Sequence, residues 1–222
     1  MLDNKFTLKP KEPPMTIIAA MKENESSILL ASDSEVAIGD IRLNYGNKLC
    51  RHPSASLAWA IAGDHTIGVD SFTPWLKAFK APLPDWKTFS DQAIRKLSEL
   101  NGERRTLIEL SHSKPNKNDV CNCLMVGWLD RPDIYELDDR GIITSYWRFG
   151  FHALGSGSLH SWVAYKALTS IGLSALPKMR AIMEAVVTTA PNCNQPIYIW
   201  RITQDTIVEG LEKGEADANA RT

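Results

Sequence analysis

The first apolar run of the chain, MTIIAAM at residues 15–21, carries a threonine directly behind a methionine. A threonine hydroxyl is a weak nucleophile at neutral pH and needs a base within hydrogen-bonding distance. The α-amino group of the same residue can be that base, because its pKa is about 7.7–8.0, provided that the threonine begins the chain. Thr16 could therefore act as a nucleophile after cleavage of its bond to Met15. In the uncut chain its nitrogen is an amide and not a base.

The other reactive side chains form weaker patterns. Cys121 and Cys123 lie two positions apart in a predicted strand, so both should face the same side, but no second pair matches them. The five histidines show no spacing typical of metal ligands. We therefore expect no metal and no organic cofactor, and four reduced cysteines of the kind found in cytoplasmic proteins.

The composition is that of a globular protein, with 44% hydrophobic residues, 23% charged residues and a net charge of -1. Lysines and arginines are scattered and form no basic stripe interleaved with aromatic residues, which argues against a nucleic-acid partner. No apolar run approaches the roughly 20 residues that a membrane helix needs. The N-terminus lacks the apolar segment of a secretory signal. We expect a cytoplasmic protein with neither a nucleic-acid nor a membrane partner.

The fold is expected to begin late in the sequence. Residues 1–14 combine several prolines with little apolar periodicity, which predicts an N-terminal extension or propeptide. Residues 15–222 contain no internal repeat and no linker, which predicts one domain of ordinary size with a polar tail from about residue 212.

The predicted elements follow the order strands, two helices, strands, two helices, strands. Few strands are separated by a single helix, which argues against a doubly wound parallel sheet and for an α+β fold. Two antiparallel sheets packed face to face, with a helix pair on each outer side, would bury every apolar stripe. The predicted strands include residues 15–21, 28–33, 55–64, 120–129 and 142–154, and the predicted helices are 64–80 (irregular around Pro74), 88–110 (bent or split at Gly102), 159–171 and 176–189.

This order and several short motifs resemble the proteasome β-subunit and HslV family of N-terminal-nucleophile hydrolases, over about residues 15–210. The resemblance implies a four-layer αββα sandwich. The matching segments are MTIIAAMK for the opening strand, ILLASDSEV for the second strand, NYGNKL for the lysine segment, AWAIAGD for the strand ending in glycine, HALGSGSLHSWVAYKAL for the Gly-Ser-Gly segment with its helix, and PIYIWRITQDTIVE for the closing hairpin.

The resemblance implies a role for each matching residue. Lys48 would hold negative charge at the nucleophile, and Asp33 would keep Lys48 in place and charged. From position 16 to position 48 the separation is 32, as is usual in the family, and from 16 to 33 it is 17, one more than usual. The implied catalytic set is Thr16 as nucleophile and base, Asp33, Lys48, Gly63 through its backbone amide in the oxyanion hole, and Ser156 as an auxiliary group.

The same resemblance implies a threonine peptidase subunit that acts on peptide substrates within a ring of identical chains, with an ATP-dependent unfoldase as a partner. A second alignment places Met15 at the nucleophile position, which would make the protein an inactive ring or scaffold. A third interpretation is a small-molecule amide hydrolase on the same fold. Each residue also has a plain structural role. Thr16 would be a strand residue, Gly63 a strand terminator and Ser156 a helix N-cap.

Two features leave the choice between these interpretations open. The segment TTAPNCNQP lies where many β-subunits carry an aspartate and a serine that support the nucleophile. Asn192 is the nearest polar side chain there, and the segment has no carboxylate. This departure favours either the HslV branch or an inactive protein. The bond before Thr16 could be exposed either by removal of Met15 as an initiator or by cleavage of a propeptide, and the chemistry requires one of the two.

Overall fold

The structure is a computed structural model, and it describes residues 16–38, 41–44, 48–113, 119–190, 193 and 195–210. Three sequence-based expectations lie outside these ranges: the N-terminal extension with Met15, the role of Asn192, and the polar tail from about residue 212.

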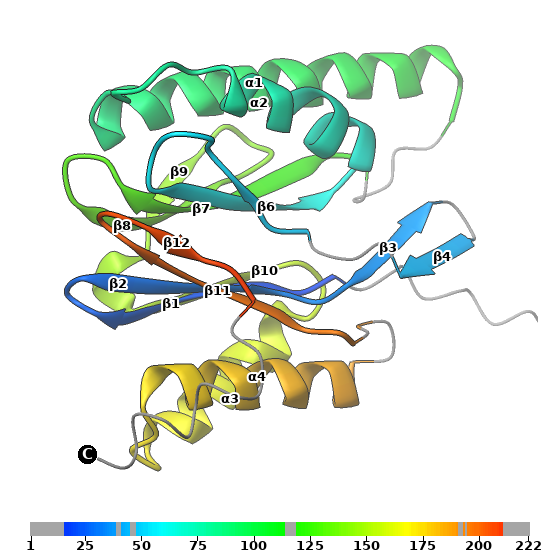
Figure 1. Ribbon diagram of the computed structural model, residues 1–222. Coiled ribbons are helices and arrows are strands. Elements are labelled where there is room, and N and C mark those ends of the chain that lie inside the picture. The colour runs from blue at the N-terminus through cyan, green and yellow to red at the C-terminus, as the bar shows by residue number, and fades with distance from the viewer. Residues whose placement is uncertain are drawn as a thin grey trace, which may run out of the picture.

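Two five-stranded antiparallel sheets lie face to face between two pairs of helices, which confirms the α+β class and the four-layer arrangement (Figure 1). A separate hairpin projects from one end of the sheets. The first sheet has the order β10 (Phe151–Leu154), β1 (Ile18–Asn24), β2 (Ser27–Ser32), β11 (Tyr198–Thr203) and β12 (Ile207–Val208); the second has β5 (Cys50–Arg51), β6 (Leu57–Gly63), β7 (Cys121–Trp128), β8 (Pro132–Leu137) and β9 (Ile143–Ser145); the hairpin is β3 (Glu35–Ile38) with β4 (Ile41–Asn44).

The helices cover the outer faces of the sheets. A π-helical segment, Thr66–Phe72, leads into α1 (Thr73–Lys77), and both lie with α2 (Trp86–Leu110) on the second sheet. Helices α3 (Ser158–Thr169) and α4 (Ala175–Thr189) lie on the first sheet. A short 3₁₀ turn, Trp147–Phe149, connects β9 to β10. None of the described helices combines the length and apolar composition that crossing a membrane requires.

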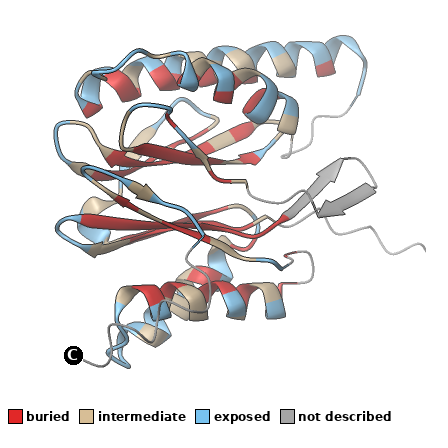
Figure 2. Ribbon diagram, in the orientation of Figure 1, coloured by how far each residue is buried: buried red, intermediate tan, exposed pale blue. Residues whose placement is uncertain are grey.

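Alternating side chains of each strand supply three apolar layers. In β1, Ala19 and Met21 pack toward α4, whereas Ile18 and Ala20 pack between the two sheets. All six residues of β2 are buried, because both faces of its sheet are covered (Figure 2). The strand ends that carry the candidate site are therefore held by packing on two sides.

Of the two helix irregularities expected from the sequence, the structure contains one and lacks the other. The irregular start expected around Pro74 is present, since the π-helical segment passes into α1 with Pro74 in the first turn of that helix. The bend or split expected at Gly102 is wrong, because α2 continues unbroken through it. A Cβ at Gly102 would meet nothing within 4 Å. An exposed glycine of this kind is tolerated in a helix without a change of direction.

The single strand predicted over residues 142–154 is also wrong. The segment forms β9, then the 3₁₀ turn, then β10, and so crosses from the second sheet to the first. Aromatic residues continue through the turn, which hides it from an apolar pattern. Gly150, with a φ of 71°, ends the turn in the left-handed region and is the one local signal of the break.

Because Gly102 is exposed within a continuous helix, Gly102→Ala should raise the free energy of unfolding by about 0.5–1 kcal/mol. Gly127→Ala should lower the free energy of unfolding by about 1–3 kcal/mol, because the added Cβ would lie 2.3 Å from the Ser56 carbonyl oxygen. Urea denaturation of both variants checks the pair. A loss of stability in Gly102→Ala would contradict the unbent helix.

Candidate active site

The candidate site lies where the start of β1 meets the end of β2 and the turn after β10. Ile18 pairs with Ser32 on one side and with Leu154 on the other. This register places Thr16 beside Asp33 and beside the turn Gly155–Ser156–Gly157. The site is at the end of the sandwich from which the β3–β4 hairpin projects (Figure 1).

A buried ion pair lies against the Thr16 hydroxyl. The Lys48 Nζ is 2.7 Å from Asp33 Oδ1 and donates to Thr16 Oγ1 at 3.4 Å. The Asp33 side chain is 0% exposed and that of Lys48 is 9% exposed, so water screens their attraction weakly. Asp33 Oδ1 also accepts a hydrogen bond from the Ile17 amide at 3.2 Å. One carboxylate thus fixes both the lysine and the backbone next to Thr16, and the ammonium can stabilise negative charge on Oγ1.

The turn after β10 holds the backbone of Thr16 from the other side. The Thr16 nitrogen donates to Ser156 Oγ at 3.1 Å, and the Gly157 amide donates to the Thr16 carbonyl oxygen at 3.3 Å. Gly155 has a φ of 90°, and a Cβ there would lie 2.0 Å from the Thr16 carbonyl oxygen. Glycine is therefore required at position 155 because Thr16 itself approaches so closely.

This geometry removes the structural alternative for Ser156. The N-cap residue of α3 is Gly157, and no side chain caps that helix, so the N-cap role considered for Ser156 is wrong. The Ser156 hydroxyl instead contacts the nitrogen that would become the α-amine after cleavage. It is exposed and free to exchange protons with water.

Gly63 ends β6 at the same end of the sandwich (Figure 1). It is exposed and has a φ of 117°, and a Cβ would lie 1.9 Å from the Val120 carbonyl oxygen. No hydrogen bond joins Gly63 to Thr16 in the part of the chain that the structure describes. The structure therefore brings Thr16, Asp33, Lys48 and Ser156 into contact, and the oxyanion role of Gly63 stays a prediction.

Sequence reasoning missed the backbone groups of the site. The Ile17 and Gly157 amides each take part in positioning Thr16, and any residue except proline could supply them. Their identity follows only from strand register and from the turn, so no side-chain pattern could have revealed them. Cys193 is buried behind the same turn, with its Sγ 3.4 Å from the point where a Gly157 Cβ would lie.

The cysteine pair of β7 plays no part in this site. Cys121 and Cys123 face the same side, as predicted, and both pack in the layer beneath α2. Burial raises the pKa of both thiols, and the charge of Asp64 adds to this effect at Cys121 as the neighbouring thiols do at Cys123. Both are therefore protonated near neutral pH and poor nucleophiles. Within the described ranges, no three His, Cys, Asp or Glu side chains gather into a group that could hold a metal ion.

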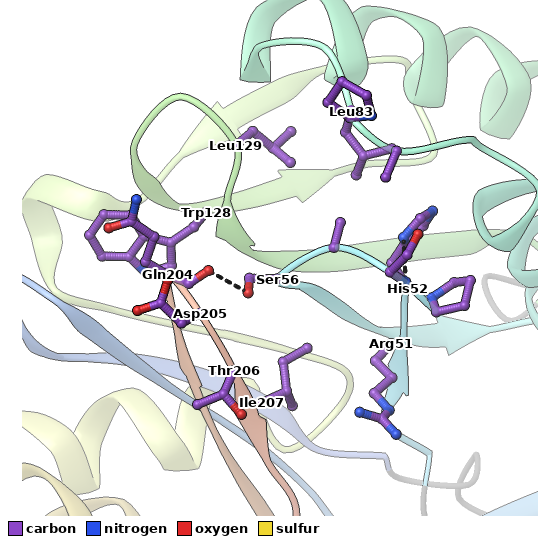
Figure 3. Close-up of a pocket in the computed structure, with 15 residues that line it drawn as sticks. Arg51, His52, Ser56, Leu83, Trp128, Leu129, Gln204, Asp205, Thr206 and Ile207 are labelled. Carbon is purple, nitrogen blue, oxygen red and sulfur yellow. Dashed lines mark hydrogen bonds between the residues drawn. The ribbon is translucent and has the colours of Figure 1, made fainter.

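A cavity of about 720 Å³ lies at the opposite end of the strands (Figure 3). The turn before β6, the end of β7 and the β11–β12 turn line it, and Ser56 Oγ donates to the Gln204 carbonyl oxygen at 2.7 Å. His52 Nδ1 accepts from the Ser54 amide at 3.2 Å, and Nε2 lies 2.9 Å from the Phe79 carbonyl oxygen. Both ring nitrogens of this buried histidine contact backbone groups, so His52 is a poor candidate for catalysis.

Comparison with known proteins supports the fold. No protein-family model and no curated protein sequence matches the chain. The structure is similar to a helical assembly of the Anbu complex from Pseudomonas aeruginosa, with a TM-score of 0.68 and 16% identity over 87% of this chain and 83% of that one. It is also similar to eukaryotic HslV from Trypanosoma brucei (TM-score 0.58, 19% identity, 85% and 99% covered). A third similar structure is BPH from Thiobacillus denitrificans in complex with epoxomicin (0.58, 18%, 86% and 100%).

The chain therefore has the fold of the proteasome-like N-terminal-nucleophile hydrolases, and the resemblance to that group is confirmed. Among the three structures named here, the Anbu complex superimposes with a higher TM-score than HslV or BPH. At these identities the likeness concerns the arrangement of the backbone.

Lys48→Met should lower the free energy of unfolding by about 3–5 kcal/mol, because it leaves the fully buried Asp33 carboxylate without its cation. Lys96→Met is the matched control. Its partner Glu99 is 55% exposed, and a surface pair of this kind contributes at most about 1 kcal/mol. Urea denaturation measures both losses. Equal losses in the two variants would contradict a structural role for the Lys48–Asp33 pair.

Proposed function

We propose that the protein is a threonine peptidase subunit whose nucleophile, Thr16, becomes N-terminal by cleavage of the Met15–Thr16 bond. One observation carries this proposal. The Thr16 hydroxyl lies 3.4 Å from a lysine that is ion-paired with a buried aspartate, while its nitrogen lies 3.1 Å from the Ser156 hydroxyl. The nucleophilic hydroxyl of Thr16 thus lies next to a fixed cation, and the nitrogen of the same residue lies next to a hydroxyl that can exchange protons.

The proposed reaction has two stages. The Thr16 α-amine accepts the hydroxyl proton as Oγ1 bonds to the carbonyl carbon of the substrate. The oxygen of the tetrahedral intermediate becomes negative and is bound by the Gly63 amide. The C–N bond then breaks, and the proton passes from the α-amine to the leaving nitrogen. Water hydrolyses the resulting ester in the same way, which releases the acid and restores the Thr16 hydroxyl.

Each supporting residue has a defined electrostatic task in this proposal. Asp33 lies 2.7 Å from Lys48 and fixes the position of its ammonium group, whose positive charge favours the unprotonated α-amine and the ionised hydroxyl. Ser156 lies where it can relay a proton between the α-amine and solvent. No metal or organic cofactor is required for these steps.

The similar structures also support assembly of the chain with itself. The similar structure from Pseudomonas aeruginosa is described as a helical assembly of the Anbu complex. On α3, Leu159 and Val163 lie one helical turn apart and are 71% and 63% exposed. Exposed apolar side chains close together on one surface are typical of protein–protein contacts. We propose a ring of identical subunits, with an ATP-dependent unfoldase as the partner that would deliver peptide substrate.

The second candidate function is an inactive ring or scaffold with an uncut N-terminus. The Thr16 nitrogen donates to Ser156 and its carbonyl accepts from Gly157, and an intact peptide chain can make both hydrogen bonds. With an amide at Thr16, the base is missing and the same strand has only a structural role. The state of one bond separates the two functions.

Intact mass and N-terminal sequencing of the assembled protein should give a chain that begins at Thr16. Thr16→Ala should retain the preceding residues if Thr16 itself performs the cleavage, because alanine has no nucleophile. Removal of Met15 by a separate aminopeptidase would leave both chains starting at position 16. A wild-type chain that keeps residues 1–15 after assembly would support the scaffold instead.

A threonine-directed epoxyketone should add once to the processed protein, at Thr16, and block hydrolysis of a fluorogenic peptide. Thr16→Ala should lose at least about 10³-fold in kcat and form no adduct, because the nucleophile is absent. Thr106→Ala changes an exposed threonine on α2 and is the matched control, with labelling and kcat near those of the wild type. Mass spectrometry and peptide kinetics provide the measurements. An adduct at another residue would refute the assignment of the nucleophile.

A further inference from the structure

Helix α2 contacts the strands where the end of β6 pairs with the start of β7. The β7–β8 ladder ends at the pair Cys123–Leu137, so Cys121 lies beyond the end of β8. Asp64 donates from its amide to the Val120 carbonyl oxygen at 3.0 Å, which marks a hydrogen-bonded pair of the β6–β7 ladder. The adjacent pair, Gly63 and Cys121, must therefore direct its N–H and C=O groups to the outer sides of the two strands.

Asn101 of α2 fills the place of the missing strand beside Cys121. Its Oδ1 accepts from the Cys121 amide at 2.9 Å, and its Nδ2 donates to the Cys121 carbonyl oxygen at 3.0 Å. Both residues are 0% exposed. Without Asn101, the N–H and C=O groups of Cys121 would be buried with no hydrogen bond from this side chain to satisfy them. The side-chain amide reproduces the two hydrogen bonds of a strand at this position.

Arg104, three residues further along α2 and on the same face of the helix, holds the residue that follows Gly63. Its Nε lies 3.0 Å from Asp64 Oδ2, in an ion pair whose N–H is not aligned for a hydrogen bond, and the Asp64 side chain is only 9% exposed. Asp64 Oδ1 in turn accepts from the Ile67 amide at 3.1 Å, at the start of the π-helical segment. The chain leaving β6 is thus tied to α2 by one ion pair and to the next helix by a hydrogen bond.

Gly63 lies between these two attachments and has little room to move. Its Cβ position would be 1.9 Å from the Val120 carbonyl oxygen, so the backbones of β6 and β7 are in direct contact there. The ladder pattern directs the Gly63 N–H away from β7, to the outer edge of β6, and Gly63 is exposed. We propose that Asn101 and Arg104 are positioning residues that hold the Gly63 amide in the direction needed to bind the oxyanion.

This inference rests on the proposed function, since it takes Gly63 as the oxyanion donor. The physical reason is that a preorganised donor stabilises the transition state only if its direction is fixed before the reaction. A displacement of about 1 Å is enough to cost up to about 10²-fold in rate. Residues of α2 that make no contact with substrate should therefore affect kcat.

The test uses the full-length, assembled protein and the pair Arg104→Gln and Arg105→Gln. Both arginines lie on α2 and form ion pairs, but Arg105 binds Asp139, which follows β8, two strands away from β6. We expect Arg104→Gln to lower kcat about tenfold with KM within about twofold, and Arg104→Lys to restore part of the loss. Arg105→Gln should stay within about twofold of the wild type in both constants. Asn101→Leu should lower kcat further, and the arginine pair decides the question if that variant does not fold.

Amide hydrogen exchange at Asp64 gives a readout that does not need catalysis. Arg104→Gln should accelerate this exchange about tenfold relative to amides of β1 in the same molecule, and Arg105→Gln should leave it unchanged. Unchanged exchange in Arg104→Gln, faster exchange without a fall in kcat, or an equal fall in kcat in both variants would overturn the inference. A wild-type protein without peptidase activity would refute the proposed function, and the exchange of Asp64 would still decide whether α2 holds the strand end.

Discussion

The geometry of the candidate site depends on one buried carboxylate. Asp33 lies at the end of β2, with its side chain 0% exposed, and binds both Lys48 and the amide of Ile17. Burial of these charges is tolerated because each has a close partner. The consequence is that three chain segments distant in sequence meet at Thr16 in a fixed arrangement. A loss of this carboxylate would release the lysine and the start of β1 together.

Close backbone contact is the second constraint on the site. At Gly155 a side chain would collide with the carbonyl of Thr16, and at Gly63 it would collide with the carbonyl of Val120. Both glycines have positive φ angles, at the ends of strands that face the same end of the sandwich. Glycine at position 155 allows Thr16 to approach the turn after β10, and glycine at position 63 allows β7 to approach β6 more closely than a β-carbon would permit. The proposed chemistry and the proposed anchoring by α2 both use this approach.

Much of the architecture could be predicted from periodicity, because the strands and helices are covered on regular faces. The segment 142–154 was the exception. Its aromatic residues continue through a turn, so no change in period marks the crossing from one sheet to the other. Gly102 is the converse case, since a glycine at an exposed position can lower the stability of a helix without interrupting it. Sequence patterns predicted the elements correctly where the pattern of buried residues follows the backbone conformation.

The sequence by itself supplied the residues of the proposed chemistry: a threonine that could serve as its own base once its amine is free, with Asp33 and Lys48 at suitable separations. The tertiary structure decided which of these groups meet. Ser156, which could have capped a helix, instead accepts a hydrogen bond from the Thr16 nitrogen. The amides of Ile17 and Gly157 also form hydrogen bonds at the site. Asn101 was invisible in the sequence because its two hydrogen bonds go to backbone atoms. Backbone groups are common to all residues, so only strand register and the packing of helix on sheet can choose among them.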